Sequence, residues 1–248
     1  MRLAAFVAGT GSGGTLGAGD FLKDAQGSRI IAVEPTSCPT MLYNGYGSHN
    51  IQGIGDKHIP LIQNVMNTDA VVAVSDDSCD RLNVLFNNEV GRAYLMERKG
   101  ISPFLLDQMH HLGLSGIANV LAAIKTARYY ELTEKDLIVT VATDGSSLYN
   151  SERNKTLSTA FGGEFDTVSA AETFAEHFIG VDGDHYLETN HRDRRRIFNL
   201  GYFTWVEQRG VDLEIFDQRA EQKFWRSLQD VLPVWDEMID DFNKQTSG

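Results

Sequence analysis

Short apolar runs rich in β-branched residues alternate with helical periodicity over the first 150 residues of this chain. The runs that we predict as strands are AAFVA (4–8), RIIAVE (29–34), AVVAV (70–74) and LIVTVA (137–142). Nearly continuous apolar character is typical of parallel strands buried on both faces, which need crossover helices between them. The pattern therefore predicts an α/β fold, a parallel sheet with flanking helices.

Serines mark the predicted helix starts between the third and fourth strands. Ser75 is a candidate cap for one helix. Ser102, followed by Pro103 in a first-turn position, opens a second helix that Gly113 ends. Ser115 is the candidate cap of a third. We therefore predict three helices in this stretch.

From about residue 150 no further strand is predicted, and helix signals follow one another to the end. A capping-box pattern at Ser169 begins a helix that ends near Gly180. A second helix is predicted over about 193–209, with these residues inward: Ile197, Leu200 and Phe203. Two amphipathic helices follow it. We therefore divide the chain into an α/β domain, 1–152, and an α-helical extension, 153–248.

Composition excludes several classes of partner. The chain has 22 Lys and Arg against 34 Asp and Glu, a net charge of −12 that would repel a phosphate backbone. Its basic run HRDRRR (191–196) is interpreted as a packed helix with a salt-bridged outer face. No apolar run is long enough to span a membrane, and the two cysteines fit a reducing compartment. We expect a cytoplasmic protein with no nucleic-acid or membrane partner.

The sequence gives weak support for a metal site or a hydrolase active site. Histidines and aspartates cluster at His177, Asp182, Asp184, His185 and His191, but their spacing matches no compact zinc pattern, so no metal is predicted. The Ser and His residues lack the context of a nucleophile elbow, which disfavours a hydrolase.

The segment FVAGTGSGGTLGAG leads a strand through closely spaced glycines into a helix. Glycines allow positive φ and close backbone approach, so successive N–H groups and the helix N-terminus can surround an anion. The hydroxyls of Ser12 and Thr15 add two donors. A phosphate is the natural ligand of such a loop.

Spacing alone leaves several interpretations of this loop open. Gly9, Gly11 and Gly14 satisfy G-x-G-x-x-G, and Glu34 ends the next strand where a dinucleotide fold keeps its ribose-binding acid. A Rossmann-type oxidoreductase or nucleotide-binding module is therefore one alternative. Another phosphate cofactor and an ordinary glycine-rich turn are the others. A Walker loop is excluded because no lysine follows the last glycine.

Several motifs in one order carry a family resemblance. They are GTGSGGT, IIAVEP, HNIQGIGDKHIP at 49–60, LGLSGIANVLAAIKTA at 112–127 and LIVTVATDGSSLYNSE at 137–152. Together they resemble the second half of the cysteine synthase and cystathionine β-synthase family, pyridoxal-phosphate enzymes of the tryptophan-synthase-β-like fold. The resemblance covers about residues 4–152.

The resemblance implies a set of cofactor contacts. It assigns the phosphate of pyridoxal 5'-phosphate to Gly11, Ser12, Gly13, Gly14 and Thr15. It places the Gly53 backbone beside the cofactor ring. Asp144 is our candidate for the pyridine nitrogen, with Thr143 and Ser146 as the other registers. A hydroxyl partner would leave that nitrogen largely unprotonated, whereas a carboxylate would favour its protonation.

The resemblance also implies a reaction, a β-elimination or β-replacement on a small amino acid such as O-acetylserine or serine, in an enzyme that is a homodimer at full length. The family's Schiff-base lysine and its Ser/Thr-Gly-Asn loop belong to a half that is not found in this chain, so no catalytic residue is assigned. Lys57 is the lysine nearest to the expected site, but an exposed loop lysine is the ordinary case. Truncation, a split enzyme and a non-catalytic homologue are the explanations left open. In each case we expect this chain alone to be inactive.

Overall fold

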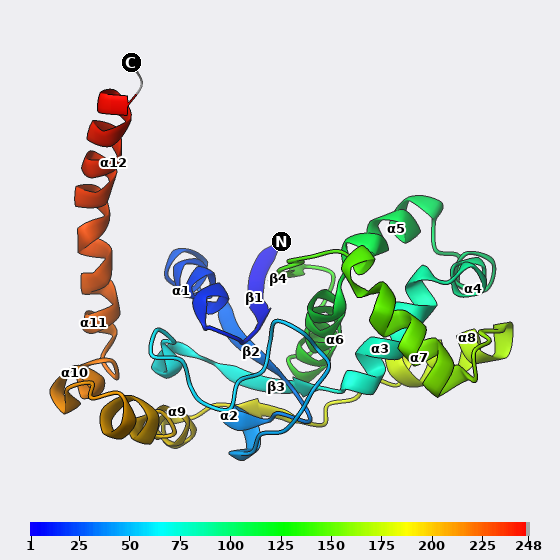
Figure 1. Ribbon diagram of the computed structural model, residues 1–248, viewed down its shortest axis with the longest axis horizontal. Coiled ribbons are helices and arrows are strands. Elements are labelled where there is room, and N and C mark those ends of the chain that lie inside the picture. Colours follow the sequence, from blue (N-terminus) through cyan, green and yellow to red (C-terminus); the bar gives the residue numbers. More distant parts are fainter. Residues whose placement is uncertain (247–248) are drawn as a thin grey trace.

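The computed structural model describes residues 1–246 and is built around one five-stranded sheet (Figure 1). Its strands are β1 (Arg2–Gly9), β2 (Arg29–Pro35), β3 (Ala70–Val74), β4 (Asp136–Thr140) and β5 (Tyr186–Glu188). The order across the sheet is β4-β1-β2-β3-β5. The first four strands are parallel, and β5 pairs antiparallel with β3. The predicted α/β class is confirmed.

Helices connect and flank these strands. Those of the first part are α1 (Gly14–Gln26), α2 (Thr40–Tyr43), α3 (Asp76–Asn87), α4 (Glu89–Lys99), α5 (Pro103–Gln108) and α6 (Leu114–Tyr129). Those of the second part are α7 (Asn150–Phe161), α8 (Thr167–Phe174), α9 (His191–Asn199), α10 (Leu213–Gln218), α11 (Gln222–Ser227) and α12 (Leu232–Thr246). Short 3₁₀ segments lie at Val65–Asn67, Met109–His111, Ser146–Tyr149 and Leu228–Val231, and π-helical turns at Ala175–Ile179 and Phe203–Gln208.

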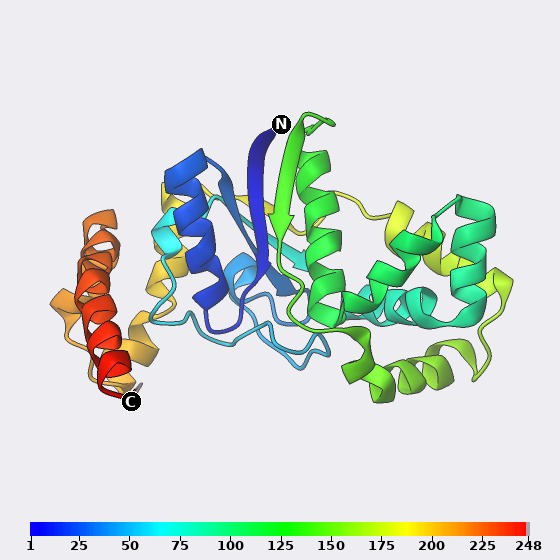
Figure 2. The same ribbon diagram turned by 90° about the horizontal axis from the view of Figure 1, so that it is seen from above.

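The sheet is the middle layer of three, with a separate apolar core on each face. Val7 and Ile31 point into a core shared with α3, α6 and α8. Phe6 and Ile30, their neighbours along the strands, point into a second core with α1, α9 and α10. Figure 2 shows α1 and α6 on opposite sides of β1 and β4. Burial on both faces explains why the strand sequences read as continuous apolar runs.

Two of the predicted caps are confirmed. The Ser75 hydroxyl accepts the Ser78 N–H at the start of α3. The Ser102 hydroxyl accepts the Leu105 N–H, with Pro103 in the first turn of α5. The helix predicted to end near Gly180 does end there, after α8 and a π-helical turn.

Two other caps are wrong. Gly113, not Ser115, precedes α6, and the Ser115 hydroxyl instead contacts the hydroxyl of Thr143, beyond the end of β4. Asp166, not Ser169, caps α8, because its carboxylate accepts the Ser169 N–H from three residues upstream. The count of helices between β3 and β4 is also wrong, since α3, α4, α5 and α6 lie there.

The second part of the chain departs further from prediction. It contributes β5, which no strand signal indicated because three residues are too short to show a period. The single helix predicted over 193–209 is interrupted at Gly201 between α9 and a π-helical turn. Ile197 is buried as predicted, whereas Phe203 is 64% exposed, because the interruption turns its side chain away from the core.

The C-terminal α12 projects from the rest of the molecule (Figure 1). Its apolar stripe is exposed, with Trp235, Met238, Ile239 and Phe242 each between 55% and 65% accessible. Within residues 1–246, no helix is long and apolar enough to cross a membrane.

Candidate functional site

A cavity of about 190 Å³ lies beyond the carboxyl ends of β1 and β4, which is where ligands bind in open α/β sheets. It is lined by Gly9, Thr15, Gln52, Gly53, Ile54, Ser115, Asn119, Val141, Thr143 and Asp144. Four parts of the chain thus meet there: the β1–α1 connection from Gly9 to Thr15, the 52–54 loop, the start of α6 and the chain after β4.

The glycine-rich loop presents free backbone donors at this edge of the sheet. Among residues 1–246, no acceptor takes the N–H groups of residues 11–15. Gly13 has φ +86°, a left-handed conformation that turns the chain into α1 and that side chains disfavour. The positive end of the 13-residue helix α1 adds to the field of these amides. The loop can therefore bind an anion without a basic side chain.

A second loop closes tightly over the first. A Cβ added to Gly11 would lie 2.7 Å from the Gly53 carbonyl oxygen, closer than real Cβ contacts allow. The Gly55 N–H donates to the Thr10 carbonyl at 2.7 Å. Gly53 has φ +84°, so a side chain there would be strained even though the space beside it is open. Glycine is therefore favoured at Gly11 by the close approach of the second loop, and at Gly53 by its positive φ.

The opposite wall carries a hydroxyl pair and a carboxamide. Ser115 Oγ and Thr143 Oγ1 lie 3.1 Å apart. Asn119 donates its amide to the Val141 carbonyl at 2.9 Å, which leaves its buried Oδ1 without a partner in residues 1–246. Because burying an unsatisfied oxygen is costly, this atom indicates a donor that the chain itself does not supply.

Asp144 lines the same cavity, but one of its oxygens is already engaged. Asp144 Oδ2 accepts the Tyr149 hydroxyl at 2.5 Å. Burial, and then this carboxylate, raise the pKa of Tyr149. Asp144 Oδ1 is buried without a partner in the described chain, close above Gly113 at the N-terminus of α6. Ser146 donates to Asn87 and does not line the cavity.

Three of the seven predicted cofactor-binding residues line this cavity, and the other four, Gly11, Ser12, Gly13 and Gly14, do not. Thr15, Gly53 and Asp144 meet around one cavity, whereas the Lys57 side chain lines a different cleft. No lysine of the described residues lines this cavity. Sequence reasoning missed Ser115 and Asn119 as site residues. Their i, i+4 spacing places both residues on one face of the predicted helix. This spacing does not indicate whether that face lies toward β4.

The Glu34 carboxylate binds backbone N–H groups at the start of α2, which conflicts with ribose binding. It is 2% exposed, and its two oxygens accept the N–H groups of Met41 and Leu42 at the start of α2. Burial raises its pKa to about 7, against these hydrogen bonds. A carboxylate engaged in this way cannot serve a ribose hydroxyl, which removes the acid that the dinucleotide-binding alternative needs.

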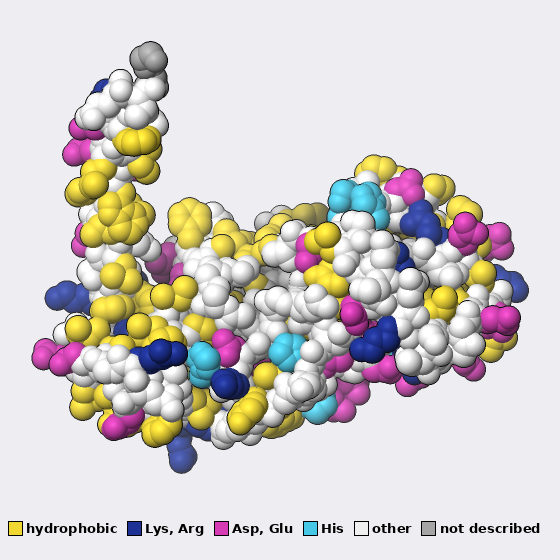
Figure 3. Space-filling view, viewed as in Figure 1, with side chains coloured by type: hydrophobic (Ala, Val, Ile, Leu, Met, Phe, Trp, Pro, Cys, Tyr) yellow, Lys and Arg dark blue, Asp and Glu magenta, His cyan; other side chains and the backbone are white. Residues whose placement is uncertain are grey.

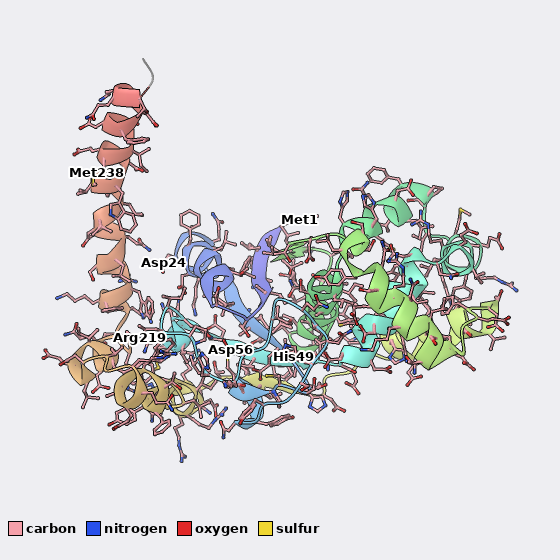
Figure 4. All side chains as sticks on the ribbon, in the orientation of Figure 1. Met1, Asp24, His49, Asp56, Arg219 and Met238 are labelled. Atoms are coloured by element: carbon pink, nitrogen blue, oxygen red, sulfur yellow. The ribbon has the colours of Figure 1, made fainter. Side chains whose placement is uncertain are left out.

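The helical extension holds the loop that closes over the glycines. Arg196 donates to the Met41 carbonyl, and Trp205 donates its indole N–H to the Ile59 carbonyl at 2.7 Å. Farther along, Gln222 and Asn64 exchange two side-chain hydrogen bonds. Arg219, labelled in Figure 4, is 3% exposed and surrounded by aromatic rings. Burial lowers its pKa to about 10.

Comparison with known proteins relates this arrangement to one family. The chain is 36% identical over 131 residues to cysteine synthase B of Campylobacter jejuni, covering 52% of this chain and 38% of that protein. It is 32% identical over 147 residues to a cysteine synthase of Staphylococcus aureus, covering 58% and 41%. About half of this chain is therefore similar in sequence to part of these cysteine synthases. No protein-family model matches it.

The chain spans about two fifths of the length of these cysteine synthases. Among solved structures, an O-acetylserine-dependent cystathionine β-synthase from Helicobacter pylori is 30% identical, with a TM-score of 0.44 over 60% of this chain and 43% of that one. A cysteine synthase from Entamoeba histolytica is 25% identical, with a TM-score of 0.48 over 71% and 46%. The predicted family resemblance is confirmed by the cysteine synthase sequences.

Proposed function

We propose that residues 1–152 form the pyridoxal-phosphate-binding part of a cysteine-synthase-type lyase or transferase, and that residues 153–248 support it. The observation that carries the proposal is the set of unengaged amides at residues 11–15, beside a cavity that also contains Gly53 and Thr143. The similarity to cysteine synthases supports the reaction class that the sequence resemblance implies, β-elimination or β-replacement on a small amino acid.

The residues around the cavity fit this cofactor in charge and shape. The amides of residues 11–15 and the Thr15 hydroxyl would hold the phosphate through hydrogen bonds to an anion. The Gly53 backbone leaves room beside the ring where a side chain would intrude. The unpartnered Asn119 oxygen would accept a hydrogen bond from a polar group of the bound molecule. When bound, pyridoxal phosphate supplies an electron sink for carbanion chemistry.

The polar wall after β4 sets the protonation of the ring nitrogen. We favour the Ser115–Thr143 hydroxyl pair as its partner, because one Asp144 oxygen accepts the Tyr149 hydroxyl and the other lies close to Gly113. A neutral hydroxyl partner leaves the nitrogen largely unprotonated. Asp144 would then have no direct contact with the ring nitrogen and would instead orient Tyr149 and the start of α6. The assignment of Asp144 as the direct partner of the ring nitrogen stays a prediction.

In this proposal the chain binds and orients the cofactor but provides no base. None of the lysines among residues 1–246 lines the cavity. Removal of the substrate's α-proton would thus require a lysine from a segment outside this chain. We accordingly expect cofactor binding without turnover from this chain alone.

Pyridoxine 5'-phosphate tests cofactor binding, because its alcohol cannot react with surface lysines. Calorimetric titration should give saturable 1:1 binding, at least about tenfold tighter than that of unphosphorylated pyridoxine, since charge-assisted hydrogen bonds contribute about 1.5–3 kcal/mol. Thr15→Val should weaken it, whereas Thr133→Val, on a surface turn, should not. Equal affinity for the two compounds would refute the phosphate site.

A further inference from the structure

A second hollow lies on the outer side of the 46–58 loop, where that loop meets the π-helical turn of the extension. Its volume is about 530 Å³, within the range of small-molecule sites. It is lined by Tyr46, Lys57, His58, Phe203, Thr204, Trp205, Gln208 and Arg209. We call it the extension cleft. No residue lines both this cleft and the cavity of the cofactor proposal.

The charge of the extension cleft is opposite to that of the whole chain. None of its lining residues is acidic, although the chain carries a net charge of −12. Within residues 1–246, the side chains of Lys57 and Arg209 form no hydrogen bond or ion pair. Asp56, which precedes Lys57 in the sequence, has its carboxylate 3.4 Å from His58 Nδ1. Two uncompensated cations therefore face the cleft, as expected for an anion site.

Figure 3 shows Lys and Arg side chains on both sides of a histidine at the lower left of this face. Figure 4 labels Asp56 at the edge of the same region. Lys57 and Arg209 are both exposed to solvent.

Aromatic rings occupy the rest of the lining. Tyr46 is 71% exposed and Phe203 is 64% exposed, so neither ring is used in packing. Trp205 is held in place by its hydrogen bond to the Ile59 carbonyl and by an edge contact with His58. Exposed rings beside unpaired cations suit a ligand with a planar base and a phosphate, because bases stack on aromatic faces and phosphates pair with Arg and Lys.

We propose that the extension cleft binds a nucleoside phosphate. The base stacks on Phe203 or Tyr46, and the phosphate lies between Lys57 and Arg209. A mononucleotide suits the cleft better than a polynucleotide, since two cations cannot offset the repulsion of a chain with this net charge. The site depends on the extension, which contributes five of the eight lining residues, and it does not depend on the proposed cofactor function.

Titration calorimetry with ADP tests this proposal on the full chain. We expect saturable 1:1 binding that weakens about tenfold in Lys57→Gln and in Arg209→Gln, the loss of one charged hydrogen bond to phosphate. Arg192→Gln is the matched control, because Arg192 is exposed on α9 outside the cleft, and ADP affinity should not change. Circular dichroism of each variant checks that the fold is retained.

Several results would overturn the proposal. They are the absence of saturable ADP binding at millimolar concentration, equal affinity for adenosine and ADP, an equal loss of affinity in the Arg192 control, and tighter binding of a single-stranded RNA than of ADP. Pyridoxine 5'-phosphate separates the two sites. If it displaces ADP competitively, ADP is in the cofactor cavity and the cleft proposal fails. If ADP binds and pyridoxine 5'-phosphate does not, only the cofactor proposal fails.

Discussion

Replacing Gly11 with alanine should lower the stability of the protein, whereas replacing Gly17 with alanine should raise it. Gly11 lies in the glycine loop, where an added Cβ would be 2.7 Å from the Gly53 carbonyl oxygen and 3.8 Å from the Ile54 Cα. Gly17 lies inside α1, where an added Cβ would meet nothing within 4 Å. The two positions are six residues apart, and each variant adds the same methyl group, so they form a matched pair.

The magnitudes follow from these surroundings. The atom facing Gly11 belongs to the backbone and cannot rotate away, so the two loops must separate, and overpacking of this kind typically destabilises by about 1–3 kcal/mol. Gly17→Ala should instead stabilise by up to about 1 kcal/mol, since alanine is the better helix former. We expect the unfolding free energies of the two variants to differ by roughly 1–4 kcal/mol.

Urea unfolding followed by far-ultraviolet circular dichroism measures this difference. Pyridoxine 5'-phosphate titration adds a second readout, because displacement of the Gly53 loop should weaken binding in Gly11→Ala and leave it unchanged in Gly17→Ala. If Gly11→Ala is as stable as the unmodified protein and binds as tightly, the two loops do not pack as described, and the reasoning about the site is wrong.

Three further experiments, one of them with a matched control variant, test other parts of the structure. Burial raises the pKa of Glu34 from 4.5 to about 7, so the folded state binds the proton more tightly than the unfolded state. The free energy of unfolding should therefore fall by about 3 kcal/mol as the pH rises from 4.5 to 7. Glu34→Gln should remove this part of the pH dependence. Trp205→Phe deletes a hydrogen bond of the extension and should destabilise by about 1 kcal/mol, whereas Trp235→Phe on the exposed α12 should not. Ile239→Ser with Phe242→Ser should reduce self-association seen by light scattering, because both side chains are exposed.

Each of these variants has an outcome that contradicts it. An unchanged pH profile in Glu34→Gln would mean that the carboxyl does not titrate in this range. Equal urea midpoints for the two tryptophan variants would remove the role of the extension in holding the 59–64 segment. Unchanged light scattering after the double replacement on α12 would place the aggregating surface elsewhere.

Local signals in the sequence determined four of the five strands, two caps and the glycine-rich loop. Period and composition identify a doubly buried strand such as AVVAV, because both of its faces must be apolar wherever its partners lie. Ser75 and Ser102 capped their helices because a cap bonds to a backbone N–H only two or three residues away. The glycine loop was readable for the same reason, since its amides and its conformation belong to one short segment.

Tertiary structure alone decided which distant groups meet. Ser115 had the sequence of a cap and became half of a hydroxyl pair with Thr143, because β4 ends beside α6. Glu34 had the position of a ribose-binding acid, and the fold turned it toward α2. The extension cleft joins Lys57 to Arg209 across 152 positions. Such pairings depend on how layers pack, and a sequence pattern with a reach of a few residues carries no information about them.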